Sequence, residues 1–289
     1  MVIPAPDIGG LLLVDKPAGM TSHDVVAIVR RATHSRRVGH TGTLDPFATG
    51  LLVVLVGRGT RLIPYIDGEP KVYEATFRFG AETDTDDRTG TVTREAELPR
   101  DASIAEGIAR LTGEIDQMPP AYSAKKVDGT RSYDAARRGM SLDLKSSRVT
   151  VHEWGLIRRT DDEVTARITC SGGTYVRALA RDLGRYTDSA AHLSALRRLR
   201  SGPFDVADAV TLDQVRSDVL PLRSLRSGVP SLPTQRVDAT ELRRVVHGNA
   251  IAARTPGPRV ALLDDEETLI AVAERAADEL RPALVLRDA

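Results

Sequence analysis

Cysteine is almost absent from this sequence: Cys170 is the only one among 289 residues. A single cysteine excludes an internal disulfide and a cysteine-based metal cluster, and it fits the reducing conditions of the cytoplasm. No apolar run approaches the roughly 20 residues that cross a bilayer. No basic segment precedes the short apolar stretch near the N-terminus, and the phosphate-binding loop, the HExxH motif and the dinucleotide-binding glycine pattern are missing. These absences predict a cytoplasmic protein.

Net charge is also absent, because 40 basic residues balance 40 acidic ones. A neutral chain is by itself an argument against RNA binding, but the charges are unevenly distributed. Residues 122–148 are rich in Lys and Arg, whereas residues 261–289 are rich in Asp and Glu. All but five of the 40 basic residues are arginines, which suit bidentate contacts with phosphate. The pattern allows a localised site for a polyanion, although each residue alone also fits an ordinary charged surface.

The most informative segment is residues 39–50, with the sequence GHTGTLDPFATG. Asp45 lies between a glycine-rich approach and Pro46, a residue that ends any helix or strand. The apolar run at 51–56 predicts a buried strand, so we expect the carboxylate on a rigid loop that enters the core. Such loops often carry catalytic groups. The alternative is a turn in which Asp45 bonds its own backbone, and spacing alone favours neither interpretation.

Four more segments accompany this loop. They are residues 12–22 (LLVDKPAGMTS), 71–75 (KVYEA), 117–126 (QMPPAYSAKK) and 170–177 (CSGGTYVR). Together with residues 39–50 they resemble, in the same order, the motifs of the TruB family of pseudouridine synthases, over residues 10–205. Lys125 is a departure, because the family commonly has an aliphatic residue at that position.

The resemblance implies an α+β fold. We expect a large catalytic domain built on a mixed, mainly antiparallel twisted sheet with flanking helices and an inserted thumb, followed by a small β-rich domain. We place the catalytic domain at residues 1–232, a mobile thumb at 119–148, and a PUA-like RNA-binding domain at 233–289.

Periodicity and capping signals predict the individual elements. Helices are expected at 22–33, 132–138, 174–185 and 211–219, from a capping box at Ser103–Glu106, and from an N-cap at Thr240 to His247–Gly248. Strands are expected at 51–56, 73–79, 164–170, 259–263, 269–273 and 284–286. The acidic tract at 82–90 is expected to be a loop, and it lacks the spacing of an EF-hand.

The family reaction breaks the C1′–N1 bond of a uridine, rotates the uracil and rejoins it through C5, without a cofactor or metal. The resemblance implies that Asp45 is the catalytic carboxylate and Arg177 the cation that keeps it charged. Tyr73 would stack on the target base and relay the C5 proton. Whether Asp45 attacks C1′, adds to C6 or abstracts a ribose proton stays open. The structural alternatives are an ordinary helix-surface arginine at 177 and a core tyrosine at 73.

Other residues are expected to contact the substrate. Lys16 either supports the Asp45 loop or contacts RNA, and His40, which could otherwise be a general base, is expected to fill the space that flipped bases leave. The substrate-binding set is Lys16, His40, Lys126, Tyr175 and Leu196. The residues expected on the RNA backbone are Lys125, Arg131, Arg197 and Arg198.

The implied protein is a stand-alone tRNA pseudouridine synthase that acts on the T-arm uridine at position 55, as a monomer without an obligate protein partner. Three rivals remain. A glycosidase-like hydrolase would need a second carboxylate about 5–5.5 Å from Asp45 and would release uracil. A non-catalytic RNA-binding protein would not need Asp45, Tyr73 and Arg177 together. A guide-RNA-dependent relative would carry longer basic extensions.

Overall fold

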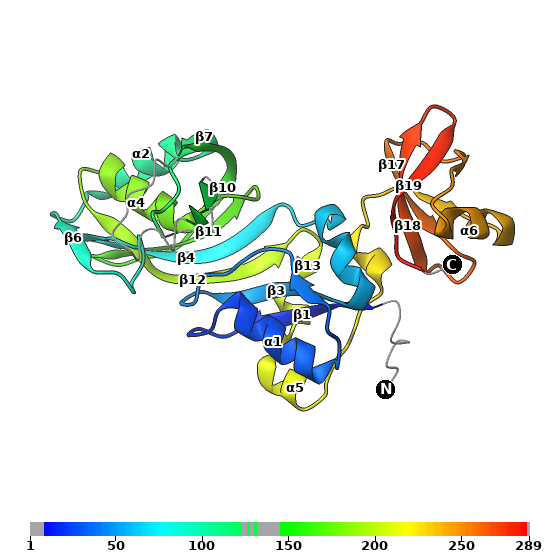
Figure 1. The fold of residues 1–289 in the computed structure, drawn as a ribbon. Helices are drawn as coiled ribbons and strands as arrows, with labels where there is room; N and C mark the ends of the chain where they lie inside the picture. The colour runs from blue at the N-terminus through cyan, green and yellow to red at the C-terminus, as the bar shows by residue number, and fades with distance from the viewer. Residues whose placement is uncertain (1–8, 123–125, 128–129, 132–144, 288–289) are drawn as a thin grey trace. The chain divides into compact units, whose positions relative to one another are not determined.

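A computed structural model describes residues 9–122, 126–127, 130–131 and 145–287. The chain forms two compact units, each with its own strands and helices (Figure 1). Unit 1 comprises Met1–Pro46, Gly50–Gly68 and Gly202–Ala289, and unit 2 comprises Phe47–Thr49 and Glu69–Ser201. None of the helices in the described part of the chain combines the length and apolarity that crossing a bilayer requires.

The first sheet of unit 1 is built on two strands, β1 (Gly10–Lys16) and β3 (Thr49–Val56). They pair antiparallel along the whole of β1, from Gly10 with Val56 to Lys16 with Gly50. β14 (Val210–Thr211) pairs with β1 in parallel, and β2 (Val38–His40) pairs with β3 antiparallel. Both faces of β1 and β3 are buried, which is why their sequences are continuous apolar runs. The predicted buried strand at 51–56 is confirmed.

Helices cover the two faces of this sheet. α1 (Ser22–Ala32) and α5 (Leu212–Arg216) lie on one face (Figure 1), where their apolar side chains share a core cluster with Leu12 and Val14 of β1. The other face, with Leu11 and Leu13, packs against the 3₁₀ helices η1 (Gly57–Tyr65) and η3 (Leu225–Gly228) and against Phe204 of β13 (Phe204–Asp205). A third 3₁₀ turn, η2, spans Val206–Asp208.

The predicted helix at 22–33 is confirmed, whereas α5 is shorter than the expected 211–219. Thr211 and Gln214 form its capping box, but Asp218 adopts a left-handed φ of 59°. A left-handed residue cannot continue a right-handed helix, so α5 ends before it.

The C-terminal part of unit 1 forms a second sheet of five strands. In spatial order they are β15 (Thr234–Arg236), β17 (Arg259–Leu263), β18 (Leu269–Ala276), β19 (Glu279–Val285) and β16 (Ile251–Ala252), accompanied by α6 (Ala239–Val246). β19 begins earlier than the strand expected at 284–286. The expected N-cap at Thr240 is wrong: Asp238 caps α6, because its carboxylate accepts from Glu241 N–H while Glu241 closes the capping box.

Five strands of unit 2 pair antiparallel, in a spatial order that differs from their order along the chain. They are β12 (Ala191–Ser201), β4 (Lys71–Phe79), β11 (Glu163–Cys170), β10 (Ser147–Arg159) and β7 (Gly113–Gln117). The predicted alternation in β4 and β11 is confirmed, since Tyr73, Ala75, Phe77 and Phe79 are all buried. The inserted segment begins and ends where Gln117 pairs with Ser147. Within it, β8 (Lys126–Val127) pairs with β9 (Thr130–Arg131), and the expected helix at 132–138 lies outside the described residues.

Two helices accompany this sheet, α2 (Asp101–Arg110) and α4 (Val176–Tyr186). The capping box expected at Ser103–Glu106 is wrong, because α2 already begins at Asp101 and Arg100 is its N-cap residue. α4 begins two residues later than predicted and lies close to β12: a Cβ on Gly184 would sit 2.4 Å from the backbone nitrogen of Ala191.

The acidic tract at 82–90 is only partly a loop. Its first residues belong to β5 (Ala81–Thr83), which pairs with β6 (Val92–Glu95), and the turn that follows bridges to Leu193 through Asp87. The α+β architecture and the mixed, mainly antiparallel pairing of the strands agree with what the family resemblance implied.

Candidate active site

Asp45 lies in the loop between β2 and β3, and the residues on both sides of it are held by the segment that follows β1. The Ser22 hydroxyl accepts a hydrogen bond from the N–H of Leu44 at 2.9 Å and donates to the Leu44 carbonyl at 3.2 Å. On the other side, the Pro46 carbonyl accepts from the N–H of Gly19 at 2.8 Å. Two motifs that are separated in the sequence thus form one rigid structure around a half-buried carboxylate.

The buried side chain of Lys16 holds this structure in place. Its side chain is wholly buried, at 0% exposure. Its Nζ donates to the carbonyls of Pro17 at 2.9 Å, Met20 at 2.8 Å and Pro46 at 3.4 Å. A buried ammonium is tolerated only when its donors are satisfied, and three carbonyls meet that need. Of the two roles expected for Lys16, the structure shows support of the loop, and a buried Nζ bound to carbonyls is not placed to contact RNA.

His40 is the last residue of β2 and is half-buried. Its Nδ1 accepts from the N–H of Gly42 at 3.2 Å, so the ring carries its proton on Nε2 when neutral. The ring of His23 on α1 meets it edge to face, with centroids 5.9 Å apart. These contacts fix the orientation of the His40 ring, as its expected role as a space-filling group requires.

Tyr73 shares one face of the unit 2 sheet with two other predicted site residues. In the β4–β12 register Tyr73 is opposite Arg198, and Leu196 is opposite Ala75. Tyr73 and Leu196 are each 7% exposed and Arg198 is 2% exposed. Tyr73 therefore fits a core position as well as the wall of a closed pocket. The side chain of Arg198 lies inside the fold, and its expected contact with the RNA backbone stays a prediction.

Arg197 pairs in register with Glu74 and so lies on the opposite face of the sheet, where it is half-buried. This placement separates it from Arg198, although both were expected to contact the RNA backbone. A phosphate contact stays a prediction for both arginines.

Arg177, near the start of α4, is not an ordinary surface arginine, because only 5% of it is exposed. Its guanidinium donates to the carbonyl of Thr85 at 2.8 Å and to that of Tyr122 at 2.9 Å. The Asp87 carboxylate lies 3.6 Å from the same group. The guanidinium is thus held in one orientation by the acidic tract and by the first residues of the inserted segment.

Gln117, whose role was not predicted from the sequence, holds the start of α4 with its side chain. Its amide oxygen accepts from the N–H of Tyr175 at 2.8 Å, and its amide nitrogen donates to the Tyr175 carbonyl at 3.1 Å. Tyr175 is the N-cap residue of α4. The clamp therefore fixes the half-buried Tyr175 and, two residues on, Arg177.

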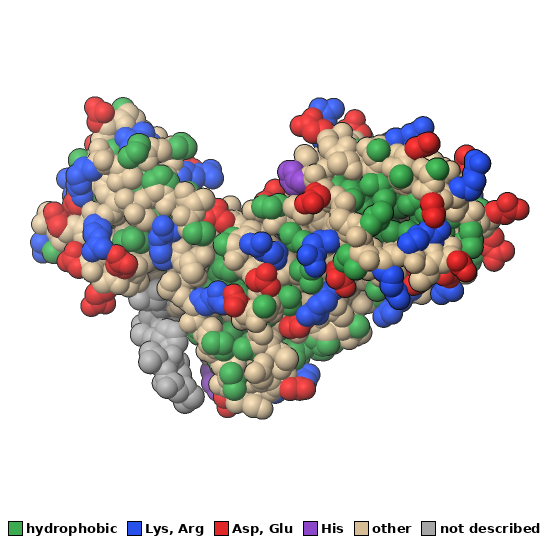
Figure 2. Space-filling view, turned by 180° about the vertical axis from the view of Figure 1, so that it is seen from behind, with side chains coloured by type: hydrophobic (Ala, Val, Ile, Leu, Met, Phe, Trp, Pro, Cys, Tyr) green, Lys and Arg blue, Asp and Glu red, His purple; other side chains and the backbone are tan. Residues whose placement is uncertain are grey.

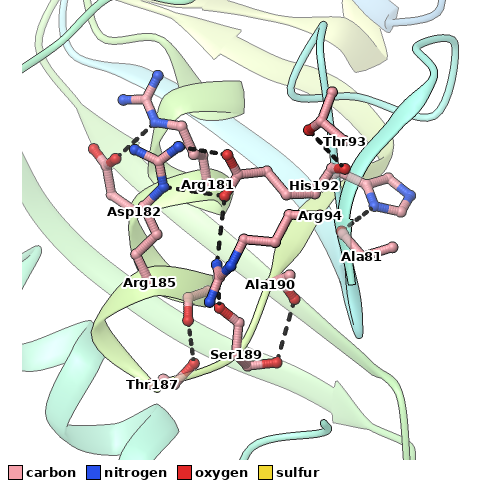
Figure 3. Close-up of polar contacts among 12 residues, drawn as sticks. Ala81, Thr93, Arg94, Arg181, Asp182, Arg185, Thr187, Ser189, Ala190 and His192 are labelled. Carbon is pink, nitrogen blue, oxygen red and sulfur yellow. Dashed lines mark hydrogen bonds and ion pairs between the residues drawn. The ribbon is translucent and has the colours of Figure 1, made fainter. Parts of the chain in front are cut away.

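Three carboxylates of the acidic tract, which was expected to be a loop, are buried, and each pairs with an arginine of α4. Glu82, Asp86 and Asp87 are 7%, 5% and 4% exposed. Arg94 and Arg185, both labelled in Figure 3, each form an ion pair with the Glu82 carboxylate. Burial raises the pKa of Asp86 to about 6, an increase that nearby Arg181 and Arg177 limit. A signal for this arrangement was present in the sequence, because residues 177, 181 and 185 share one face of a helix.

The predicted residues fall into two groups. Lys16, His40 and Asp45 belong to unit 1, and the set in unit 2 is Tyr73, Tyr175, Arg177, Leu196, Arg197 and Arg198. The approach of Arg177 to Asp45 therefore stays a prediction. Lys126 and Arg131 are register partners in β8 and β9, and Lys125 lies outside the described residues. On the face shown in Figure 2, acidic and basic side chains of the described residues are interspersed.

Comparison with known proteins gives a consistent family assignment for almost the whole chain. The family described as TruB family pseudouridylate synthase (N-terminal domain) matches residues 30–176. The one described as tRNA pseudouridylate synthase B C-terminal domain matches residues 177–247.

Curated relatives named tRNA pseudouridine synthase B match at full length. The protein from Thermobifida fusca is 46% identical over 286 residues, covering 96% of this chain and 98% of the relative. That from Leifsonia xyli is 44% identical over 288 residues, covering 94% of each chain. Among solved structures, the archaeal box H/ACA Nop10–Cbf5 complex matches with a TM-score of 0.74 at 21% identity, covering 98% of this chain and 87% of that chain. A Cbf5–Nop10–Gar1 complex matches with a TM-score of 0.73 at 23% identity, covering 98% and 86%. These two likenesses concern the fold.

Replacement of Lys16 by methionine tests the support of the Asp45 loop. Methionine fills a similar volume but leaves the carbonyls that Nζ serves without their donor, so Lys16→Met should lower the free energy of unfolding by about 3 kcal/mol. The exposed Lys145 provides a matched control, and Lys145→Met should change stability by less than about 0.5 kcal/mol. Chemical denaturation measures both. Equal stabilities of the two variants would show that the buried ammonium does not support the loop.

Proposed function

Since the chain belongs to the TruB family of pseudouridylate synthases, we propose that it converts the T-arm uridine at position 55 of tRNA to pseudouridine without a guide RNA. At the level of the family it is a tRNA pseudouridine synthase, an isomerase. The observation that carries the proposal is the loop of Asp45, whose neighbours Leu44 and Pro46 are both fixed by hydrogen bonds to the segment 16–22. A rigid carboxylate is what this reaction needs.

The reaction is an internal rearrangement of one nucleotide. The C1′–N1 bond breaks, the uracil turns, a C1′–C5 bond forms and the proton of C5 is lost while N1 gains one. Asp45 supplies the carboxylate that acts on the uridine. The target base has to leave its stack, which costs a few kcal/mol that contacts in the pocket must offset.

Tyr73 and Arg177 carry the other two roles. Stacking of the target base on Tyr73 would contribute roughly 1–3 kcal/mol, and its hydroxyl would relay the proton from C5. Arg177 would keep the Asp45 carboxylate charged in a closed pocket. The fixed orientation of the guanidinium, held by the carbonyls of Thr85 and Tyr122, supports this role.

Further features belong to the same proposal. The catalytic domain would span residues 1–232 and a PUA-like RNA-binding domain residues 233–289, a division that the separate five-stranded sheet supports. We expect the enzyme to act as a monomer in the cytoplasm, on tRNA, without an obligate protein partner. Lys125, Arg131, Arg197 and Arg198 are the residues proposed to contact the RNA backbone, and Lys126 is proposed to bind the substrate.

Mapping pseudouridine in tRNA tests the substrate. Purified protein and unmodified tRNA should give pseudouridine at position 55 alone, detected by carbodiimide modification and primer extension. Asp45→Asn should form none while its tRNA affinity stays within about threefold, because the amide keeps the shape of the side chain but removes its charge. The matched control is Asp213→Asn, at a side chain that is 90% exposed, and it should be fully active. Substantial turnover by Asp45→Asn would refute the assignment.

Two variants of Tyr73 separate its proposed contacts from a core role. Tyr73→Phe keeps the ring and loses the hydroxyl, so binding should persist while the single-turnover rate falls. Tyr73→Leu also loses stacking, worth about 1–3 kcal/mol, or roughly a 5- to 150-fold loss of affinity for the target nucleotide. Competition binding and single-turnover kinetics measure the two effects. Near wild-type values for both variants would make Tyr73 a core residue only.

A further inference from the structure

α4 carries three arginines at intervals of four residues, and each pairs with a carboxylate of the acidic tract. Arg177 pairs with Asp87, Arg181 with Asp86 at 3.2 Å, and Arg185 with Glu82. The middle arginine is placed differently from the last. Arg181 is 7% exposed, whereas the Arg185 side chain is 54% exposed.

Arg181 joins two segments that are remote in the sequence. One end of its guanidinium binds the Asp86 carboxylate, and its Nη2 donates to the carbonyl of Met118 at 2.8 Å. Its Nε donates to Asp182 at 2.8 Å, which fixes the plane of the guanidinium group. Arg181 and Asp182 lie on the α4 face drawn in Figure 3. The acidic turn and the start of the inserted segment are therefore both tied to one side chain.

The same two segments hold Arg177. The turn supplies the Thr85 carbonyl and the Asp87 carboxylate, and the inserted segment supplies the Tyr122 carbonyl. Any shift of the turn or of residues 118–122 would move these acceptors. A displacement of about 1 Å at a catalytic group can cost about 100-fold in rate.

We propose that Arg181 and Asp86 form a positioning pair for the isomerisation, which aligns the two segments around Arg177 and acts on the reaction only through Arg177. The inference rests on the proposed function, in which Arg177 touches the reacting groups. Arg181 and Asp86 themselves need no contact with RNA.

Energetics favour positioning over stabilisation. Burial makes the ionised form of Asp86 costly, which is why its pKa is raised to about 6. Between the ordinary value of 3.8 and about 6 the folded protein binds more protons than the unfolded chain, so this group lowers stability as the pH rises through that window. Buried ion pairs are often weak contributors to stability. A charge retained at such a cost is better explained by the geometry that it imposes.

Four charged groups act electrostatically on Asp86, namely Arg181, Arg177, Glu82 and Asp182. Further charged groups lie on the same or neighbouring elements: Arg185 on α4, Asp84, Asp87 and Arg88 on the turn after β5, Arg94 on β6 and His192 on β12. A pH profile of the wild-type protein alone would combine all of these groups. Comparison with Asp86→Asn, in which only the titratable group of residue 86 is removed, isolates the effect of Asp86.

The test compares Arg181→Met with Arg185→Met, the same change one helical turn away. Arg181→Met should reduce the single-turnover rate of pseudouridine formation by about 10- to 100-fold, with the tRNA dissociation constant changed less than about threefold. Arg181→Lys should restore part of the rate because it keeps the positive charge, but not all of it because the planar guanidinium group is lost. Arg185→Met should match the wild type. A wild-type rate for Arg181→Met, or parallel losses of rate and affinity, would overturn the proposal.

Asp86→Asn is the second variant, and it serves if Arg181→Met does not fold. Asp86 has a left-handed φ of 60°, which asparagine also tolerates. The wild-type rate should fall as the pH drops through about 6, where Asp86 becomes protonated, and this acid limb should be missing from a uniformly slower Asp86→Asn. If Asp86→Asn kept both the acid limb and the wild-type rate, the proposed role of the Arg181–Asp86 pair would be overturned. A wild-type protein that makes no pseudouridine would instead refute the proposed function.

Discussion

A buried ammonium determines the geometry of the Asp45 loop. Lys16 has no exposed surface, and a charge without solvent has to be surrounded by acceptors. Main-chain carbonyls are among these acceptors, including that of Pro46, so the backbone next to Asp45 cannot move without breaking a contact of the buried charge. With Ser22 holding Leu44 on the other side, the backbone on both sides of Asp45 is fixed.

Unit 2 uses the same principle with guanidinium groups. Arg177 and Arg181 are buried and are satisfied by carbonyls of Thr85, Tyr122 and Met118 together with two carboxylates. Planar guanidinium groups suit this task, because their donors point in fixed directions. In both units, a buried cation therefore converts segments that are distant in sequence into one rigid arrangement around a candidate catalytic group.

The sequence predicted what short-range patterns determine. The continuous apolar run of β3 follows from the burial of both its faces, and the alternation in β4 and β11 follows from the burial of one face. The acidic tract was predicted only as a loop, because its burial depends on Arg181 and Arg185, which follow their carboxylate partners by 95 and 103 residues along the chain. Its burial and the clamp of Gln117 on Tyr175 depend on tertiary contacts, as does the interior position of Arg198. The motif resemblance singled out Asp45 and Arg177, but the hydrogen bonds that hold the neighbours of Asp45 and the guanidinium of Arg177 could not be predicted from it.

We propose that this chain exchanges N1 for C5 at a tRNA uridine without a guide RNA. The decisive measurement uses a tRNA transcript labelled with tritium at C5 of its uridines, and purified protein without guide RNA. Formation of the C1′–C5 bond displaces the hydrogen of C5, so one tritium per tRNA should be released into water and no free uracil should form. Absence of tritium release, or release of uracil, would contradict the proposal.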